Sequence, residues 1–183
     1  MIQKIPTVAY PRSGNTFLDY ALRLMYYPED KLIMFYHTEK SVDKFNKFLV
    51  PLRNPLDAIA SWSIYSDLYK GSTEDHINFY IRLNAKILNN KHKSVILDFE
   101  KFTQDLSYLE NVIKNNFGYS VKSKTSIEDI KSLIKEELGD NWTPRNNKIE
   151  LNKTKEIIES NQLYTKAFNF YNNLKEATAL LDT

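Results

Sequence analysis

The 183-residue sequence predicts an α/β fold, in which a central, mostly parallel sheet lies between two layers of helices and is followed by a helical C-terminal part. Two observations predict it. Short apolar runs with the length of strands alternate with helical patterns over the first hundred residues, as in parallel sheets covered on both faces. After residue 99 only helical patterns remain. The length suits one domain, so residues 1–183 are expected to form a single unit.

Four apolar segments have the character of strands. They cover residues 2–9, 32–36, 48–52 and 94–99. Each is short, apolar and bounded by polar or turn-forming residues, which is typical of buried strands in such a sheet. Ligands of open parallel sheets bind beyond the carboxyl ends of the strands, so the residues that follow these segments are the first to examine.

The helices are predicted from their apolar spacing and their start and stop signals. The first covers residues 16–26. A second begins after the cap Asn54 with Pro55 in its first position, and a third begins at the capping pattern Ser72-x-x-Asp75. Three more follow the last strand: residues 106–117 before a glycine, 126–138 before a glycine, and 163–181. Residues 120–125 and 140–150 are predicted to be polar connectors.

Composition excludes several classes of protein. Cysteine is absent, and the histidines at 37, 76 and 92 are not at ligand spacing, so we expect no metal. His76, in the first turn of a helix, and His92, in a lysine-rich stretch, are expected to be surface residues. A net charge of +2 is low for a nucleic-acid surface, and we expect no nucleic acid as partner. No apolar run approaches the ~20 residues of a membrane span. The first ten residues lack the apolar core of a signal peptide, so a cytoplasmic location is expected.

The segment after the first strand has the features of an anion site. Arg12, Ser13, Gly14, Asn15 and Thr16 join the strand to a helix. Backbone N–H groups at such a turn converge at the positive end of the helix, and the short polar side chains and the arginine add donors. An ordinary capped turn is the alternative. The segment does not match a nucleotide-hydrolase loop, because that loop needs a Gly-Lys pair and the chain has none.

A second cluster follows the third strand. Arg53 directly follows residues 48–52, and Ser61 lies two helical turns after the cap Asn54, on the same helix face. An arginine and a hydroxyl converging at this edge would hold a second phosphate. The alternative is that Arg53 pairs with Asp57 and that Ser61 is a small packing residue.

Together the two clusters resemble the sulfotransferase family, which uses 3′-phosphoadenosine 5′-phosphosulfate (PAPS) as donor. The family's first loop typically reads Tyr-Pro-Lys/Arg-Ser-Gly-Thr-Thr-Trp, and its second motif reads Arg-Asn-Pro-x-Asp-x-x-x-Ser. Here these segments are YPRSGNTF and RNPLDAIAS. The likeness covers about residues 2–102, including SVILDFEKF, which is similar to the family's strand ending in Glu-Asp-Leu. It implies a P-loop-like three-layer sandwich.

The resemblance also implies roles for particular residues. Residues 12–16 would hold the 5′-phosphosulfate, with Arg12 at the bridging oxygen in place of the usual lysine. Phe17 stands where the family's Trp stacks on adenine, and Arg53 with Ser61 would bind the 3′-phosphate. His37 ends a strand, as the family's catalytic histidine does, and would accept the proton of the acceptor. Glu100 is the alternative base, since some carbohydrate sulfotransferases use a glutamate.

The implied reaction is sulfuryl transfer from PAPS, without a metal, to a hydroxyl or amine of a small-molecule or carbohydrate acceptor. Trp62, Tyr65 and Tyr69 either line an acceptor pocket or form a buried helix face. The chain is short for the family and lacks its C-terminal glycine-rich segment, for which Arg145 and Lys148 are the nearest substitutes. Two alternatives stay open: a nucleotide-binding module without transfer activity, and a small-molecule or nucleotide kinase.

Overall fold

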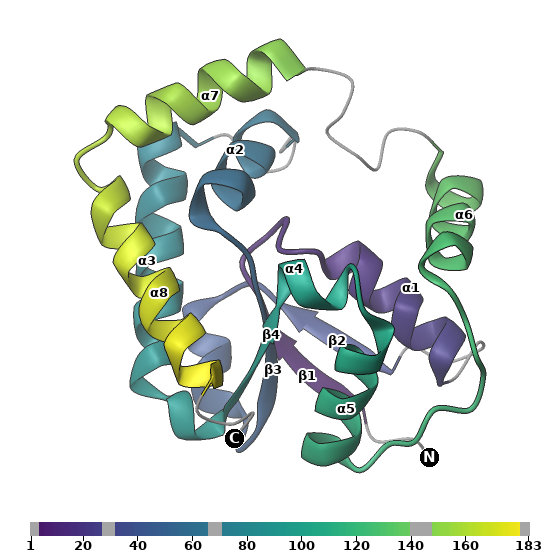
Figure 1. Ribbon diagram of the computed structural model, residues 1–183. Helices are drawn as coiled ribbons and strands as arrows, with labels where there is room; N and C mark the ends of the chain where they lie inside the picture. The colour runs from purple at the N-terminus through teal and green to yellow at the C-terminus, as the bar shows by residue number, and fades with distance from the viewer. Residues whose placement is uncertain (1–3, 27–31, 66–70, 140–147, 180–183) are drawn as a thin grey trace.

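The computed structural model describes residues 4–26, 32–65, 71–139 and 148–179 (Figure 1). These ranges contain four strands, eight α-helices and two 3₁₀ turns. In chain order they are β1 (Ile5–Val8), α1 (Asn15–Met25), β2 (Ile33–Tyr36), η1 (Glu39–Lys44), β3 (Phe48–Leu52), α2 (Pro55–Tyr65), α3 (Thr73–Asn89), η2 (Lys91–Lys93), β4 (Ser94–Asp98), α4 (Phe99–Phe102), α5 (Leu106–Phe117), α6 (Ile127–Leu138), α7 (Lys148–Ser160) and α8 (Tyr164–Ala179).

The four strands form one sheet in the order β2-β1-β3-β4, and every pair is parallel. The chain leaves β1 toward one edge to form β2 and then crosses back to form β3 on the other side of β1. The strand order therefore reverses between β1 and β3, and the crevice at such a reversal is where open α/β sheets bind ligands.

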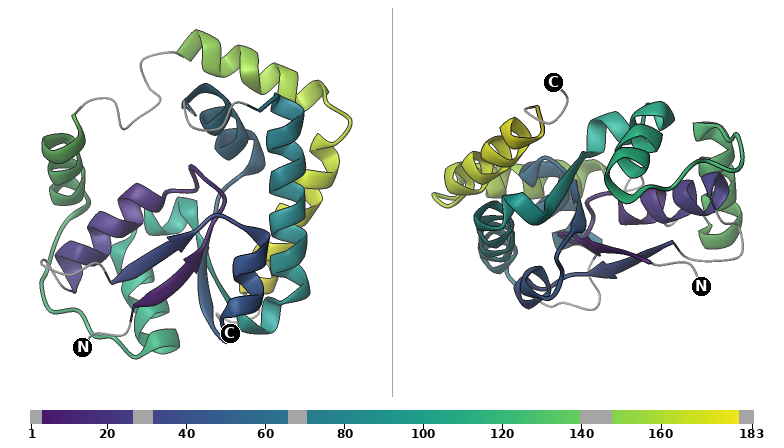
Figure 2. Two further views of the ribbon diagram at one scale, coloured as in Figure 1. Left: turned by 180° about the vertical axis from the view of Figure 1, so that it is seen from behind. Right: turned by 90° about the horizontal axis from the view of Figure 1, so that it is seen from below.

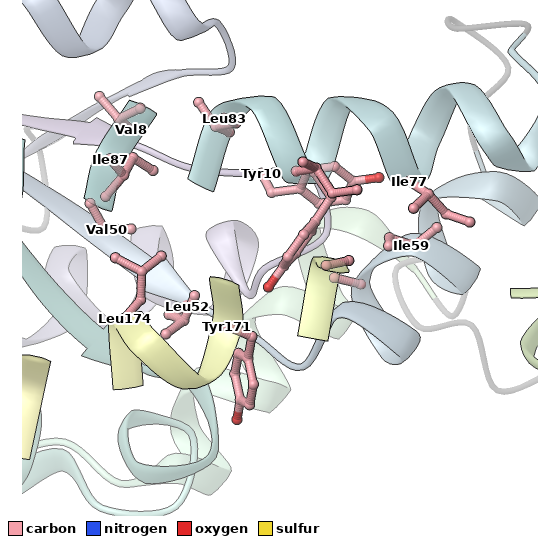
Figure 3. Close-up of a cluster of buried hydrophobic side chains, with 14 of the residues drawn as sticks. Val8, Tyr10, Val50, Leu52, Ile59, Ile77, Leu83, Ile87, Tyr171 and Leu174 are labelled. Carbon is pink, nitrogen blue, oxygen red and sulfur yellow. The ribbon is translucent and has the colours of Figure 1, made fainter. Parts of the chain in front are cut away.

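Alternating side chains of the strands point into two separate cores. Phe48 and Val50 of β3 belong to the core that α2, α3, α7 and α8 cover, whereas Leu49 between them belongs to the core under α1, α5 and α6. This is the period-2 alternation of a strand. Figure 2 shows the helices on both sides of the sheet, and Figure 3 shows residues of the strands meeting α3 and α8 in the first core. The predicted layered α/β fold with a helical C-terminal part is confirmed.

The predicted helix starts are confirmed where a cap sets them. Asn54 accepts from the backbone N–H of Leu56 at 2.9 Å before α2. Ser72 and Ser126 each form a reciprocal capping box, before α3 and α6. None of the helices within the described ranges combines the length and the apolar character that a bilayer span requires.

Three expectations were wrong. Residues 148–150 are not a connector: α7 begins at Lys148, and it escaped prediction because Ile158 is its only buried residue and Ile149 and Ile157 are exposed. The fourth strand ends at Asp98, and Phe99 opens α4. His76 is not a surface residue, since its ring stacks on Trp62 with centroids 4.7 Å apart and only 4% of the residue is exposed.

Candidate functional site

The two sequence clusters lie on either side of the reversal point of the sheet. β1 ends at Val8 and leads into residues 9–14, and β3 ends at Leu52 and leads into Arg53 (Figure 1). Because the strands are parallel and adjacent, their carboxyl ends meet at one edge of the sheet. The segments that the sequence singles out are therefore neighbours.

The loop before α1 has an unusual backbone. Gly14 occupies the cap position of α1 with φ of 86°, and Arg12 also has a positive φ, of 65°. A left-handed conformation is uncommon for a residue with a side chain and marks local strain. Gly14, as the cap residue, has no side chain to bond the first N–H groups of α1, and the first turn of α1 has no acidic residue. The field of this helix end is therefore not neutralised by the helix itself.

Hydrogen bonds join the two clusters directly. Nε of Arg12 donates to Oγ of Ser61 at 3.1 Å, and Nη1 of Arg53 donates to the backbone carbonyl oxygen of Arg12 at 2.9 Å. Ser61 is buried on α2, and Arg53 lies just before that helix. Residues 49 positions apart in the chain are thus held in one hydrogen-bonded unit.

The guanidinium of Arg53 lies in an environment that disfavours charge. Burial, and to a lesser extent the nearby charge of Arg12, lower the pKa of Arg53, against opposing effects of Asp57 and Glu100. Nε of Arg53 is buried and has no hydrogen-bond acceptor among the described residues. Buried charged groups are normally paired, so this half-buried guanidinium keeps unused bonding capacity that would suit an anion.

Asp57 does not form the ion pair with Arg53 that one interpretation of the sequence offered. Its carboxylate pairs instead with Nζ of Lys155 on α7, at 2.5 Å. Helix α7 thereby neutralises the acidic residue in the first turn of α2. Among the described side chains no carboxylate lies within 4.0 Å of the Arg53 guanidinium.

The remaining residues of the first loop differ in how deeply they are buried. Ser13 is buried, Thr16 is half-buried, and Oδ1 of Asn15 is buried without a donor among the described residues. Phe17 is only 6% exposed and packs against Phe102, with ring centroids 6.1 Å apart. The structure therefore places Phe17 in the core beneath the loop and does not bring it to the loop surface.

His37 follows β2 and lies beside the first loop. Tyr36 pairs with Val8 in the sheet, so the next residues of the two strands, His37 and Ala9, leave the sheet together. Nδ1 of His37 is 2.7 Å from the carbonyl oxygen of Ala9. A carbonyl only accepts, so Nδ1 carries the proton, and in the neutral ring Nε2 keeps the lone pair. The residue is exposed, which is compatible with a proton acceptor.

Glu100 lies in the first turn of α4, beside Asp98, the last residue of β4. Burial and a hydrogen bond with Asp98 raise the pKa of Glu100. Burial opposes ionisation of Asp98 too, but the hydrogen bond from Glu100 and the charge of Lys175 hold its pKa below the ordinary value. Asp98 also caps α4 through its Oδ1 and pairs with Lys175 of α8 at 3.3 Å. Asp98 thus has a structural role at the start of α4, whereas Oε2 of Glu100 is buried without a hydrogen-bond partner among the described residues.

Other predicted residues lie away from this unit or outside the described ranges. Trp62 is buried, in agreement with a helix face and not with an open pocket. Lys148 is exposed at the start of α7, and Arg145, Tyr69 and the side chain of Tyr65 lie outside the described residues. Within the described ranges no three His, Cys, Asp or Glu side chains are grouped as a metal site.

Sequence reasoning missed Phe99, Lys155 and Lys175. Phe99 packs against Gly14 and stacks on Arg53, and the two lysines neutralise the aspartates at the starts of α2 and α4. Each contact joins segments far apart in the chain, so no local spacing could have revealed it. The order Asp98-Phe99 immediately after a strand resembles a helix cap and could have suggested α4.

The chain was compared with family models, with curated proteins and with solved structures, and no match was found in any of the three.

Proposed function

We propose that this protein transfers a sulfuryl group from PAPS to the hydroxyl or amine of a small-molecule or carbohydrate acceptor. The observation that carries the proposal is the hydrogen-bonded unit of Arg53, Arg12 and Ser61 at the reversal point of the sheet. It unites the two segments that resemble the donor-binding motifs of sulfotransferases, and its two arginines suit a ligand with phosphate groups at both ends of a ribose.

Each residue then has a role in the reaction. The uncapped start of α1 and the side chains of Ser13, Asn15 and Thr16 would hold the 5′-phosphosulfate. The charge of Arg12 would stabilise the bridging oxygen as its bond to sulfur breaks. Arg53 and Ser61 would bind the 3′-phosphate. Because Phe17 is buried, we do not propose that it stacks on the adenine ring.

The tautomer of His37 determines which of its nitrogen atoms can accept the proton of the acceptor. The acceptor oxygen or nitrogen attacks sulfur, the sulfur–oxygen bond to the 5′-phosphate breaks, and adenosine 3′,5′-bisphosphate leaves. Nε2 of His37 would take the proton of the acceptor, because Nδ1–H is already donated to Ala9. Glu100 stays the alternative base: burial and the neighbouring Asp98 raise its pKa, and its Oε2 has no hydrogen-bond partner among the described residues.

The test is transfer from ³⁵S-labelled PAPS, without added metal, to a panel of phenols, sugars, amines and sterols. We expect label in at least one acceptor class and loss of transfer in Arg12→Ala. Tight nucleotide binding with no labelled product from any acceptor would favour the binding-module alternative. Magnesium-dependent label transfer from [γ-³²P]ATP would contradict the proposal and favour a kinase.

A further inference from the structure

A single aromatic ring contacts both halves of the candidate donor site. Phe99, the first residue of α4, has its ring centroid 4.5 Å from Cζ of Arg53. The same ring lies against the first loop, because a Cβ built on Gly14 would be 2.6 Å from Cδ2 of Phe99. Phe99 therefore contacts both the loop that carries Arg12 and the guanidinium that holds the carbonyl of Arg12.

The register of the sheet explains how Phe99 reaches this place. Leu52 of β3 pairs with Asp98 of β4, so the residues that follow, Arg53 and Phe99, leave the sheet side by side. Asp98 turns the chain at once into α4 by accepting from the backbone N–H of Glu100 at 3.0 Å. The Phe99 ring thus lies at the carboxyl edge of the sheet, beside Arg53.

Several contacts fix the ring independently of Arg53. The Phe99 ring packs edge-on against Phe102, with centroids 5.7 Å apart. The backbone carbonyl of Phe99 accepts a hydrogen bond from the hydroxyl of Thr103 at 2.7 Å, and Lys175 forms an ion pair with Asp98, which caps α4. A ring positioned in this way by its own surroundings is a fixed surface on which a long arginine side chain can be oriented.

We propose that Phe99 is a positioning residue of the donor site: its π face orients the guanidinium of Arg53, and its edge fixes the loop at Gly14. The inference rests on the proposed function for its ligand. A half-buried guanidinium that lies over an aromatic face keeps the N–H groups at its edge free to bond oxygen atoms, because the ring covers only one of its faces. One of them holds Arg12, and the others are aligned for a phosphate.

The experiment compares Phe99→Leu, which removes the π face, with Phe99→Tyr, which keeps it. Phe117→Leu is the control, because Phe117 belongs to the same core and its ring also lies beneath a cation, Nζ of Lys47 at 5.4 Å. Two quantities are measured: the dissociation constant for adenosine 3′,5′-bisphosphate, by calorimetry, and the ¹H–¹⁵N resonance of Arg53 Nε in the ligand-free protein. The burial of Nε slows exchange of this proton with water.

We expect Phe99→Leu to weaken bisphosphate binding about tenfold, as loss of a desolvated cation–π contact implies. Phe99→Tyr should stay within about threefold of the wild-type affinity, because it retains most of the π interaction. The Arg53 Hε resonance should be shifted upfield by the ring in the wild-type protein and in Phe99→Tyr, and should lose this shift in Phe99→Leu. Phe117→Leu should change neither quantity.

Wild-type affinity or an unchanged Arg53 resonance in Phe99→Leu would overturn the inference. Equal losses of affinity in the Leu and Tyr variants would overturn it too, since the effect would then be one of general packing. The proposed function fails separately, if the wild-type protein does not bind the bisphosphate. In that case the ligand-free resonance still decides whether Phe99 orients Arg53.

Discussion

Replacing Gly14 by alanine tests how tightly the first loop is packed on α4. The added Cβ would lie 2.6 and 2.7 Å from two carbon atoms of the Phe99 ring and 2.9 Å from Cζ of Phe102. Carbon atoms in ordinary contact are about 3.5–4.0 Å apart, so a ring must move by close to 1 Å. The substitution therefore strains the same contact that we propose to orient Arg53.

The expected magnitude has two parts. A left-handed residue with a side chain costs roughly 1–2 kcal/mol, and Gly14 has φ of 86°. Overpacking a well-packed site costs roughly 1–3 kcal/mol more. Gly14→Ala should thus lower the free energy of unfolding by roughly 2–5 kcal/mol, a large share of the roughly 5–15 kcal/mol typical of a domain.

Gly118→Ala is the matched control. Gly118 has φ of 75°, close to that of Gly14, but a Cβ there would meet no atom within 4 Å. Both variants lose the freedom of glycine in the unfolded chain, so that effect cancels between them. In urea unfolding at equilibrium, Gly14→Ala should be less stable than Gly118→Ala by roughly 1–3 kcal/mol, which is the overpacking cost alone.

A second pair of variants links this difference to Phe99. In a Phe99→Ala background the ring is gone, and the additional cost of Gly14→Ala should fall toward that of Gly118→Ala. Equal destabilisation by the two glycine substitutions in the wild-type background would refute the reasoning, because it would mean that the loop and α4 are not in contact.

Three further predictions concern the charged residues. Arg12→Ala should reduce sulfuryl transfer far more than donor binding, whereas Arg53→Ala should reduce both, because Arg53 binds donor and also holds the carbonyl of Arg12; single-turnover rates and calorimetry separate the two. His37→Ala should lower transfer by about 10²–10⁴-fold while stabilisation by adenosine 3′,5′-bisphosphate in thermal melts is unchanged; a near-normal rate would exclude it as the base. Lys175→Met should destabilise the protein by about 0.5–1 kcal/mol at neutral pH, the ion pair with Asp98 being half exposed at Lys175. Because the pKa of Asp98 is lowered in the folded state, that contribution is present above about pH 4 and should vanish as the pH falls further; urea unfolding between pH 3 and 7 measures it.

The sheet and most helix starts could be predicted because local signals determine them. β3 occupies the predicted residues 48–52, since a continuous buried run of this length suits a central parallel strand. The capping boxes at Ser72 and Ser126 likewise involve only neighbouring residues. α7 has no comparable signal: it is held by contacts with α2, such as Lys155 with Asp57, and not by an apolar stripe of its own.

For the candidate site, too, some features could be predicted from the sequence and others could not. The motifs indicated Arg12, Arg53 and Ser61, and the parallel sheet brings them together. Burial was harder to foresee, because it depends on what packs on a helix from elsewhere in the chain. Phe17 is covered by α4, and His76 is covered by Trp62 of α2. From the sequence we expected Phe17 to stack on adenine and His76 to lie at the surface, but both side chains are buried in the fold.

The most direct test of the proposed function is a calorimetric comparison of adenosine 3′,5′-bisphosphate with AMP as ligands of the wild-type protein. The two differ only in the 3′-phosphate, which we assign to Arg53 and Ser61. A phosphate held by charge-assisted hydrogen bonds should make the bisphosphate bind at least about tenfold more tightly, and Arg53→Ala should abolish that preference. Equal affinities for the two nucleotides in the wild-type protein would contradict the assignment of this site to PAPS.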